Sequence, residues 1–139
     1  AIEGLASLSK SDQFTHILGI ESRGFIFASA LANRLGKGLV LVRKPNKLPP
    51  EIYRESYGLE YGNDALEIST SVLSSDHAVL IVDDVLATGG TALAAIKLCE
   101  KINLKIESII FLMEIPELGG RSQIAKHFPD LQISVLLAE

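Results

Sequence analysis

The chain has 139 residues, 47% of them apolar, and a formal net charge of −4 at pH 7. This length suits one domain, so we expect a single domain over residues 1–139. The apolar runs are shorter than the roughly 20 residues of a membrane span. The acidic balance also lacks the clustered basic residues that contact nucleic acid. We therefore expect neither a membrane nor a nucleic-acid partner.

The start of the chain and its cysteine usage point to a reduced compartment. Residues 1–10 show no signal-peptide pattern, and Cys99 is the sole cysteine, so we expect a cytoplasmic protein without disulfides. Cys99 lies at helical spacing among apolar residues and is expected to be a small core residue. Residues 1–10 look like the tail of a helix, so we expect that a segment precedes them.

Strands and helices then alternate along the chain. An apolar strand at 16–20 is followed by a helical pattern at 24–35, which ends in Gly36 as a helix stop. Further apolar runs predict strands at 38–42, 79–82, 108–112 and 133–137. Continuous Val/Ile/Leu runs between amphipathic helices indicate an α/β fold, a parallel sheet covered by helices on both faces.

The interval 43–75 breaks this alternation. It opens with a basic, proline-rich stretch at 43–50, which suits neither a helix nor a core strand. Two short runs, 57–61 and 65–70, flank a turn signal at 62–64 and predict a hairpin. A long excursion of this kind in a compact domain is usually functional or disordered, so we expect a flexible hairpin lid over roughly 43–75.

The most informative segment is 79–96, where the apolar strand meets Asp83 and Asp84 and a loop of small residues opens a helix. The loop consists of Ala87, Thr88, Gly89, Gly90 and Thr91. Its backbone N–H groups and those of the first helical turn predict a phosphate site. The two carboxylates repel phosphate but accept hydrogen bonds from sugar hydroxyls or bind a hard cation. Together they predict a phosphoribose site.

This segment resembles the phosphoribosyl pyrophosphate (PRPP) motif of the type I phosphoribosyltransferases. Three further segments, 21–25, 43–49 and 59–68, resemble the adenine phosphoribosyltransferase family. The chain departs from the family at Asn46, where Gly is common; since Asn tolerates left-handed backbone geometry, we expect no loss of function. The family's N-terminal hood, which supplies much of the base pocket, is expected to be missing.

The resemblance implies transfer of a phosphoribosyl group from PRPP to adenine, giving AMP and pyrophosphate, with Mg²⁺. Such a reaction needs cations around the leaving pyrophosphate and exclusion of water. We expect Arg23 to reach the pyrophosphate, and Arg43, Lys44 and Lys47 to form a second cationic set. The resemblance also implies that the residue matching Arg43 enters the neighbouring subunit's site, and hence a homodimer.

The remaining candidates lie on the lid and beside the acidic pair. Glu60 is expected to act as a general acid toward adenine N7, with Tyr61 beside it on the lid. Val85 is a candidate wall of the purine slot. Mg²⁺ is expected to bind mainly through PRPP, near Asp83 and Asp84.

Two alternatives remain open from the sequence. The first is a phosphoribosyltransferase for another purine, such as xanthine or hypoxanthine. The second is a non-catalytic, PRPP-sensing regulator of the same fold, which the absence of an appended basic surface disfavours. His16, His77 and His127 are expected to lie far apart and to have no metal-binding role.

Overall fold

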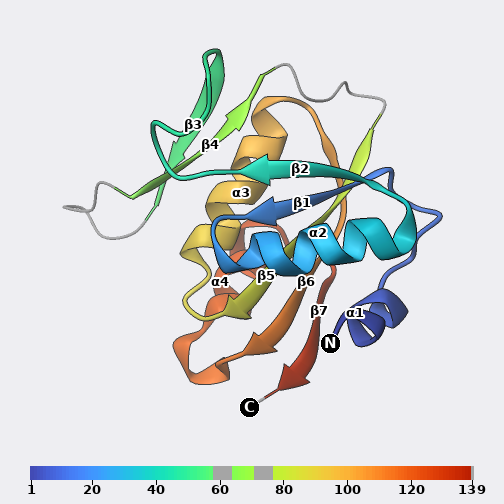
Figure 1. Cartoon of the computed structure of the whole chain (residues 1–139). Coiled ribbons are helices and arrows are strands. Elements are labelled where there is room, and N and C mark those ends of the chain that lie inside the picture. Colours follow the sequence, from blue (N-terminus) through green and yellow to red (C-terminus); the bar gives the residue numbers. More distant parts are fainter. Residues whose placement is uncertain (58–63, 71–76, 139) are drawn as a thin grey trace.

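The computed structural model describes residues 1–57, 64–70 and 77–138. Five parallel strands form the central sheet in the order β2-β1-β5-β6-β7 (Figure 1). Their bounds are His16–Ile20 for β1, Gly38–Val42 for β2, Ala78–Leu86 for β5, Lys105–Glu114 for β6 and Ile133–Ala138 for β7. The predicted parallel sheet is thus confirmed.

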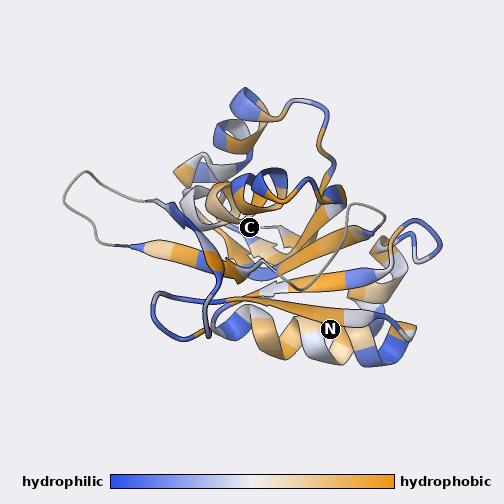
Figure 2. Cartoon of the chain, turned by 90° about the horizontal axis from the view of Figure 1, so that it is seen from above, coloured by the Kyte–Doolittle hydropathy of each residue, from blue (hydrophilic) through white to orange (hydrophobic). Residues whose placement is uncertain are grey.

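Helices cover both faces of this sheet. On one face, α1 (Ile2–Leu8) and α2 (Arg23–Leu35) contribute Leu5 and Leu31 to a core with inward residues of β1, β5 and β6. On the other face, α3 (Gly90–Lys101) and α4 (Gly120–His127) contribute Ile96 and Ile124. Figure 2 shows the apolar strands between these helix layers. Since both faces are covered, the strands are apolar throughout rather than alternating.

The strand order places a crevice at the carboxyl ends of β1 and β5. The chain steps from β1 to its neighbour β2 at the outer edge, and later returns to the other side of β1 as β5. The connections that leave the carboxyl ends of β1 and β5 therefore diverge, and ligands of open α/β sheets bind where the strand order reverses in this way. Arg23 follows the end of β1, and the predicted phosphate loop follows the end of β5.

The excursion after β2 contains an antiparallel hairpin, but its first strand differs from the prediction. β3 (Ile52–Ser56) pairs with β4 (Ala65–Ser69), so the expected first strand at 57–61 is wrong at Tyr57, and its remainder lies outside the described residues. The register is stabilised by charge, because Arg54 of β3 lies opposite Glu67 of β4 and its guanidinium is 2.5 Å from the buried carboxylate. The expected flexibility of the lid stays a prediction.

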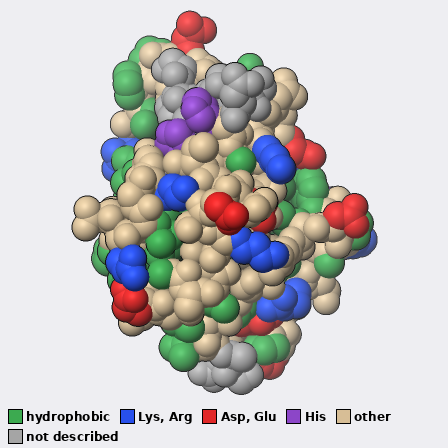
Figure 3. Space-filling model, turned by 90° about the vertical axis from the view of Figure 1, so that its right-hand side faces the viewer, with side chains coloured by type: hydrophobic (Ala, Val, Ile, Leu, Met, Phe, Trp, Pro, Cys, Tyr) green, Lys and Arg blue, Asp and Glu red, His purple; other side chains and the backbone are tan. Residues whose placement is uncertain are grey.

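Two other expectations need correction. β5 does not stop at Val82 but runs through the acidic pair to Leu86, because β6 continues to pair with it as far as Glu114. His16 and His77 do not lie far apart: parallel pairing brings the starts of β1 and β5 together, and the two rings meet edge to face at 4.9 Å. Histidine side chains lie side by side on the face shown in Figure 3. None of the described helices has the length and apolar character needed to cross a bilayer.

Candidate active site

A cavity of about 740 Å³ opens where the chain leaves β1 and β5. It brings together residues that are far apart in the sequence, from the β1–α2 connection, the basic loop after β2, the base of the hairpin lid and the end of β5. The predicted residues that line it are Arg23, Lys44, Asp83, Asp84, Val85, Ala87 and Thr91. Glu21, Ser22, Tyr57 and Ile115 complete the wall. The carboxyl ends of β1 and β5 therefore bring two of the predicted cations, Arg23 and Lys44, together with the predicted acidic pair in one cavity.

A smaller pocket of about 70 Å³ lies directly beside it, at the loop between β5 and α3. All five predicted loop residues, 87–91, line this pocket. Its volume is a little over twice the ~30 Å³ that a water molecule occupies in the liquid, so it suits a small oxyanion rather than a sugar. Gly89 adopts a left-handed conformation (φ 90°), and α3 begins at the next residue, so the N–H groups of the first turn of α3 have no partner within the helix. This geometry agrees with a phosphate cradle.

The two carboxylates of β5 have different environments. Asp83 is 9% exposed, and its Oδ1 accepts a hydrogen bond from the Asp84 N–H at 2.9 Å. A Cβ on Gly24 would lie 2.7 Å from the same oxygen, so a glycine is needed for α2 to begin this close to the acidic pair. Burial, together with the neighbouring charge of Asp84, raises the pKa of Asp83 to about 7. The environment of Asp83 thus favours its protonated form more than that of an exposed carboxyl group does.

Asp84 instead faces the cavity and is paired. Its Oδ2 lies 2.6 Å from Nε of Arg23, and its Oδ1 accepts a hydrogen bond from the Val85 N–H at 2.8 Å. The Arg23 side chain is 74% exposed, so most of its guanidinium remains open to the cavity. Arg23 begins α2 at the end of β1, which explains how a residue sixty positions earlier in the chain reaches the acidic pair.

Glu21 organises the basic loop, a role that the sequence did not suggest. Its side chain is 6% exposed, forms an ion pair with Lys47, and lies 3.4 Å from Nε of Arg43. Its Oε1 also accepts the Lys44 N–H at 2.8 Å. Burial by itself would raise the pKa of Glu21, but these bonds and charges outweigh it and hold the pKa below its usual value. The Arg43 and Lys47 side chains thus lie at the rim of the cavity rather than in its wall.

Glu67 supports the same loop from the hairpin. It is 2% exposed, it exchanges backbone hydrogen bonds with Arg43, and its Oε1 accepts the Asn46 N–H at 3.1 Å. Asn46 has φ 68°, so the expected left-handed geometry is confirmed. Glu21 directly follows the apolar strand at 16–20, and Glu67 lies inside the apolar run 65–70; an acid in such a place was the available signal for each.

Some predicted residues are not tested by this geometry, and others were missed. Glu60 and Tyr61 lie outside the described residues. Tyr57, at the base of the lid, was not predicted, although it lines the cavity and its ring lies 3.7 Å from the position of a Cβ on Gly90. Burial, with the nearby Asp64 charge, raises the pKa of Tyr57. An aromatic residue just before the expected lid tip was its only signal.

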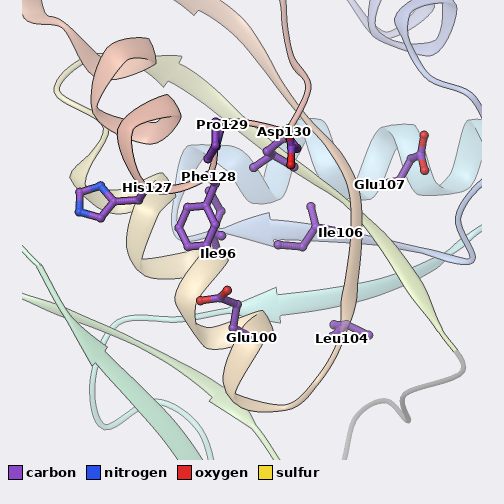
Figure 4. Close-up of a pocket in the computed structure, with 10 residues that line it drawn as sticks. Ile96, Glu100, Leu104, Ile106, Glu107, His127, Phe128, Pro129 and Asp130 are labelled. Atoms are coloured by element: carbon purple, nitrogen blue, oxygen red, sulfur yellow. The ribbon is translucent and has the colours of Figure 1, made fainter.

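A second surface cavity, of about 410 Å³, lies between the carboxyl end of α3, the start of β6 and the segment after α4 (Figure 4). Phe128, Ile96 and Ile106 form its apolar wall, and Glu100 and His127 lie at its edge. None of the predicted site residues lines it. The catalytic candidates therefore gather at the opposite end of α3.

The described residues contain no group of three or more His, Cys, Asp or Glu side chains arranged to hold a metal ion. Three carboxylates, those of Glu21, Asp83 and Asp84, line the cavity, and Glu21 is already paired with Lys47 and Arg43. One or two carboxylates completed by substrate phosphates are a usual environment for Mg²⁺. The donor set thus fits a Mg²⁺ that binds together with a phosphorylated substrate, rather than one held by a protein cage.

Comparison with known proteins identifies relatives along nearly the whole chain. The model of the phosphoribosyl transferase domain family matches residues 1–132. Adenine phosphoribosyltransferase of Polynucleobacter asymbioticus is 53% identical over 126 residues, which cover 91% of this chain and 73% of that protein. The structure of adenine phosphoribosyltransferase from Thermoanaerobacter pseudethanolicus superposes with a TM-score of 0.90 at 45% identity, covering 99% of this chain and 78% of that one. The Saccharomyces cerevisiae enzyme, solved with adenine and an imino-altritol bisphosphate, gives a TM-score of 0.88 at 37% identity, covering 98% and 77% of the two chains.

Proposed function

The chain belongs to the adenine phosphoribosyltransferase family, and we propose that its β1–β5 crevice transfers the phosphoribosyl group of PRPP to adenine, giving AMP and pyrophosphate. One observation carries the placement of this reaction: a phosphate-sized pocket adjoins a larger cavity that contains both an acidic pair and an arginine. The reaction makes AMP from a free base, which is purine salvage.

The phosphate pocket fixes one end of PRPP. In this proposal the N–H groups of 88–91 and the hydroxyls of Thr88 and Thr91 bind the 5′-phosphate, and the start of α3 adds a favourable dipole. Asp83 and Asp84 then lie beside the ribose, where they accept hydrogen bonds from its hydroxyls. Val85 forms part of the wall against the purine.

Cations in and around the cavity neutralise the leaving group. Pyrophosphate departs from an anomeric carbon and leaves an oxocarbenium-like ribosyl centre, so cations must lie where negative charge develops. Arg23 and Lys44 line the cavity, and Arg43 and Lys47 lie at its rim on the loop that Glu21 holds. When bound, Mg²⁺ adds positive charge at the pyrophosphate, with Asp83 and Asp84 as the protein's nearby carboxylates.

The lid completes the site in this proposal. Glu60 donates a proton or hydrogen bond to N7 of the attacking adenine, and Tyr61 helps to cover the base and to exclude water. The hairpin anchored by the Arg54–Glu67 ion pair places the described part of the lid, including Tyr57, beside the cavity. The same proposal locates the enzyme in the cytoplasm, on the basis of its single buried cysteine.

A homodimer is the second part of the proposal. Ile26 of α2 is 66% exposed, and Leu39 and Leu41 of the edge strand β2 are 39% and 37% exposed. Phe25 precedes Ile26 on α2, Arg43 directly follows β2, and the Arg43 guanidinium lies over the Phe25 ring at 5.7 Å. A second copy packed on this surface would be next to Arg43, which agrees with the family's use of that position in the neighbouring site. Sedimentation of Ile26→Glu should show monomers, whereas Leu137→Glu, another exposed apolar position, should leave the mass unchanged.

A turnover assay of the full-length protein with PRPP and Mg²⁺ tests the reaction. Adenine, hypoxanthine, xanthine, guanine and orotate are compared under equal conditions, and adenine should give the highest kcat/KM. A preference for xanthine or hypoxanthine would replace adenine as the substrate. PRPP binding without turnover of any base would instead favour a PRPP-sensing regulator.

The acidic pair has its own test. Replacing Asp83 and Asp84 together by Asn should raise the KM for PRPP far more than the KM for adenine, because the ribose loses its charged acceptors and the attraction for Mg²⁺ weakens. Unchanged PRPP kinetics would show that neither carboxylate acts on the ribose.

A further inference from the structure

The phosphate loop rests directly on a turn that comes thirty residues later in the chain. This turn, Gly119–Arg121, follows the short 3-10 helix η1 (Pro116–Leu118), and Gly120 and Arg121 are also the first two residues of α4. A Cβ built on Gly120 would lie 2.4 Å from the Ala87 carbonyl oxygen and 3.1 Å from the Gly89 nitrogen. A Cβ built on Gly89 would in turn lie 2.9 Å from the Gly120 carbonyl oxygen. The two segments therefore meet backbone to backbone, and the Leu86 side chain packs beside the contact, with its Cδ1 2.7 Å from the Cβ position of Gly120.

The turn is itself fixed to the sheet on both sides of the contact. The Ile115 N–H donates to the Leu86 carbonyl at 2.9 Å, which joins the end of β6 to the end of β5. The Arg121 guanidinium donates to both oxygens of Glu114, at 3.3 and 3.0 Å, and to the Ile133 carbonyl at 3.2 Å. Glu114 is 8% exposed, so this fork is partly shielded from water. The turn is thus a rigid support rather than a loose connection.

We propose that Gly120 is a positioning residue for the 5′-phosphate, because its bare backbone holds the phosphate loop in place from behind while Arg121 fixes the turn. Gly120 lines neither of the two pockets of the site, so it acts through the loop and not on the ligand. The inference rests on the proposed binding of the 5′-phosphate at 87–91.

The size of the effect follows from the contact distances. An ordinary Cβ contact begins at about 3.4 Å, so a methyl group on Gly120 requires the Ala87 carbonyl or the turn to move by up to about 1 Å. A misplacement of about 1 Å can cost about 100-fold in a preorganised site. The loop is the softer partner, because Arg121 and Ile115 hold the turn. The displacement should therefore fall on the phosphate cradle.

Binding of two ligands to full-length Gly120→Ala tests the proposal. Calorimetry should show a 10- to 100-fold weaker affinity for ribose 5-phosphate, which needs the cradle. The affinity for pyrophosphate with Mg²⁺, which depends on Arg23 and Lys44 rather than on the phosphate loop, should stay within about twofold of wild type. Gly36→Ala is the comparison variant: the positive φ of Gly36 (68°) adds backbone strain at the end of α2, but nothing lies within 4 Å of its Cβ position. It should keep both affinities.

Three results would overturn the proposal. Gly120→Ala could bind ribose 5-phosphate as tightly as wild type, or it could lose affinity for both ligands equally, which would indicate general disruption. If Gly120→Ala does not fold, Arg121→Lys decides, since it keeps the charge and loses the fork. The control is Arg34→Lys, which breaks a similar fork with Glu3 far from the site. Arg121→Lys should bind ribose 5-phosphate about threefold more weakly than Arg34→Lys. Equal affinities of these two variants would be the third result that overturns the proposal. A wild-type protein that binds ribose 5-phosphate but converts no adenine would refute the proposed reaction and leave this test intact.

Discussion

The charged form of Asp83 should destabilise the ligand-free protein, and the variant Asp83→Asn allows this effect to be measured. The pKa of Asp83 is raised from 3.8 to about 7, mainly by burial. Because the folded state holds this proton more tightly than the unfolded chain does, the free energy of unfolding falls as pH rises from about 3.8, the unfolded pKa of Asp83, to about 7, its folded pKa. Above pH 7 the carboxyl group causes no further change. The full shift corresponds to about 4 kcal/mol, of which about 2–3 kcal/mol falls between pH 5 and 8.

The variant removes this titration while it keeps the shape of the side chain. Asn at position 83 still offers an oxygen to the Asp84 N–H, which donates to Asp83 in the wild type at 2.9 Å. Urea unfolding followed by circular dichroism should show that the free energy of unfolding of Asp83→Asn, relative to wild type, rises by about 2–3 kcal/mol from pH 5 to pH 8. The variant should also bind PRPP more weakly, because a neutral amide is a poorer acceptor for ribose hydroxyls. A stabilised variant with impaired binding is the usual sign of a site that gives up stability for function.

Asp84→Asn provides the neighbouring control. It removes a like charge beside Asp83 but also breaks the 2.6 Å pair with the exposed Arg23, so these effects oppose. The net change should stay within about 1 kcal/mol at both pH values. The reasoning about Asp83 is refuted if the stability difference between Asp83→Asn and wild type is the same at pH 5 and pH 8.

Three further predictions concern the phosphate pocket, the lid and the histidine pair. Gly90→Glu should fold normally, since the nearest atom to its Cβ position is 3.7 Å away, but its affinity for AMP should fall at least 100-fold through charge repulsion. The control Gly90→Gln should lose much less affinity, and equal losses would exclude repulsion as the cause. Glu60→Gln should slow single-turnover formation of AMP by about 100- to 10,000-fold with PRPP binding nearly intact; a wild-type rate would leave Glu60 without a role in the chemistry. Burial and the nearby His77 lower the pKa of His16, so the stability that neutral His16 contributes should be lost as pH falls below about 6.5. Between pH 7 and pH 5 the free energy of unfolding of His16→Asn should therefore fall by less than that of wild type. Parallel pH curves for the two proteins would contradict this.

The sequence determined the parts of the site that are contiguous in the chain. An apolar strand, two aspartates and a loop of small residues within 79–96 were sufficient to predict the strand, the turn and the helix start around which residues 87–91 line a small pocket. Binding of phosphate in this pocket stays a prediction. The left-handed Asn46 was also predictable, since few residue types tolerate positive φ. The parallel sheet followed from apolar runs separated by helices.

Only the tertiary structure decided which distant residues meet. The strand order placed the end of β1 between β2 and β5, and so brought Glu21 to the basic loop after β2 and Arg23 to Asp84. The first strand of the hairpin was misplaced, because its register depends on the pairing of Arg54 with a buried Glu67 across the turn rather than on local turn signals. Gly120 shows the same limit: a glycine pair after a strand looks like an ordinary turn until the fold places it against Gly89. Local geometry is encoded within a few residues, whereas burial and long-range contacts, which set the pKa of Asp83, exist only once the sheet is assembled.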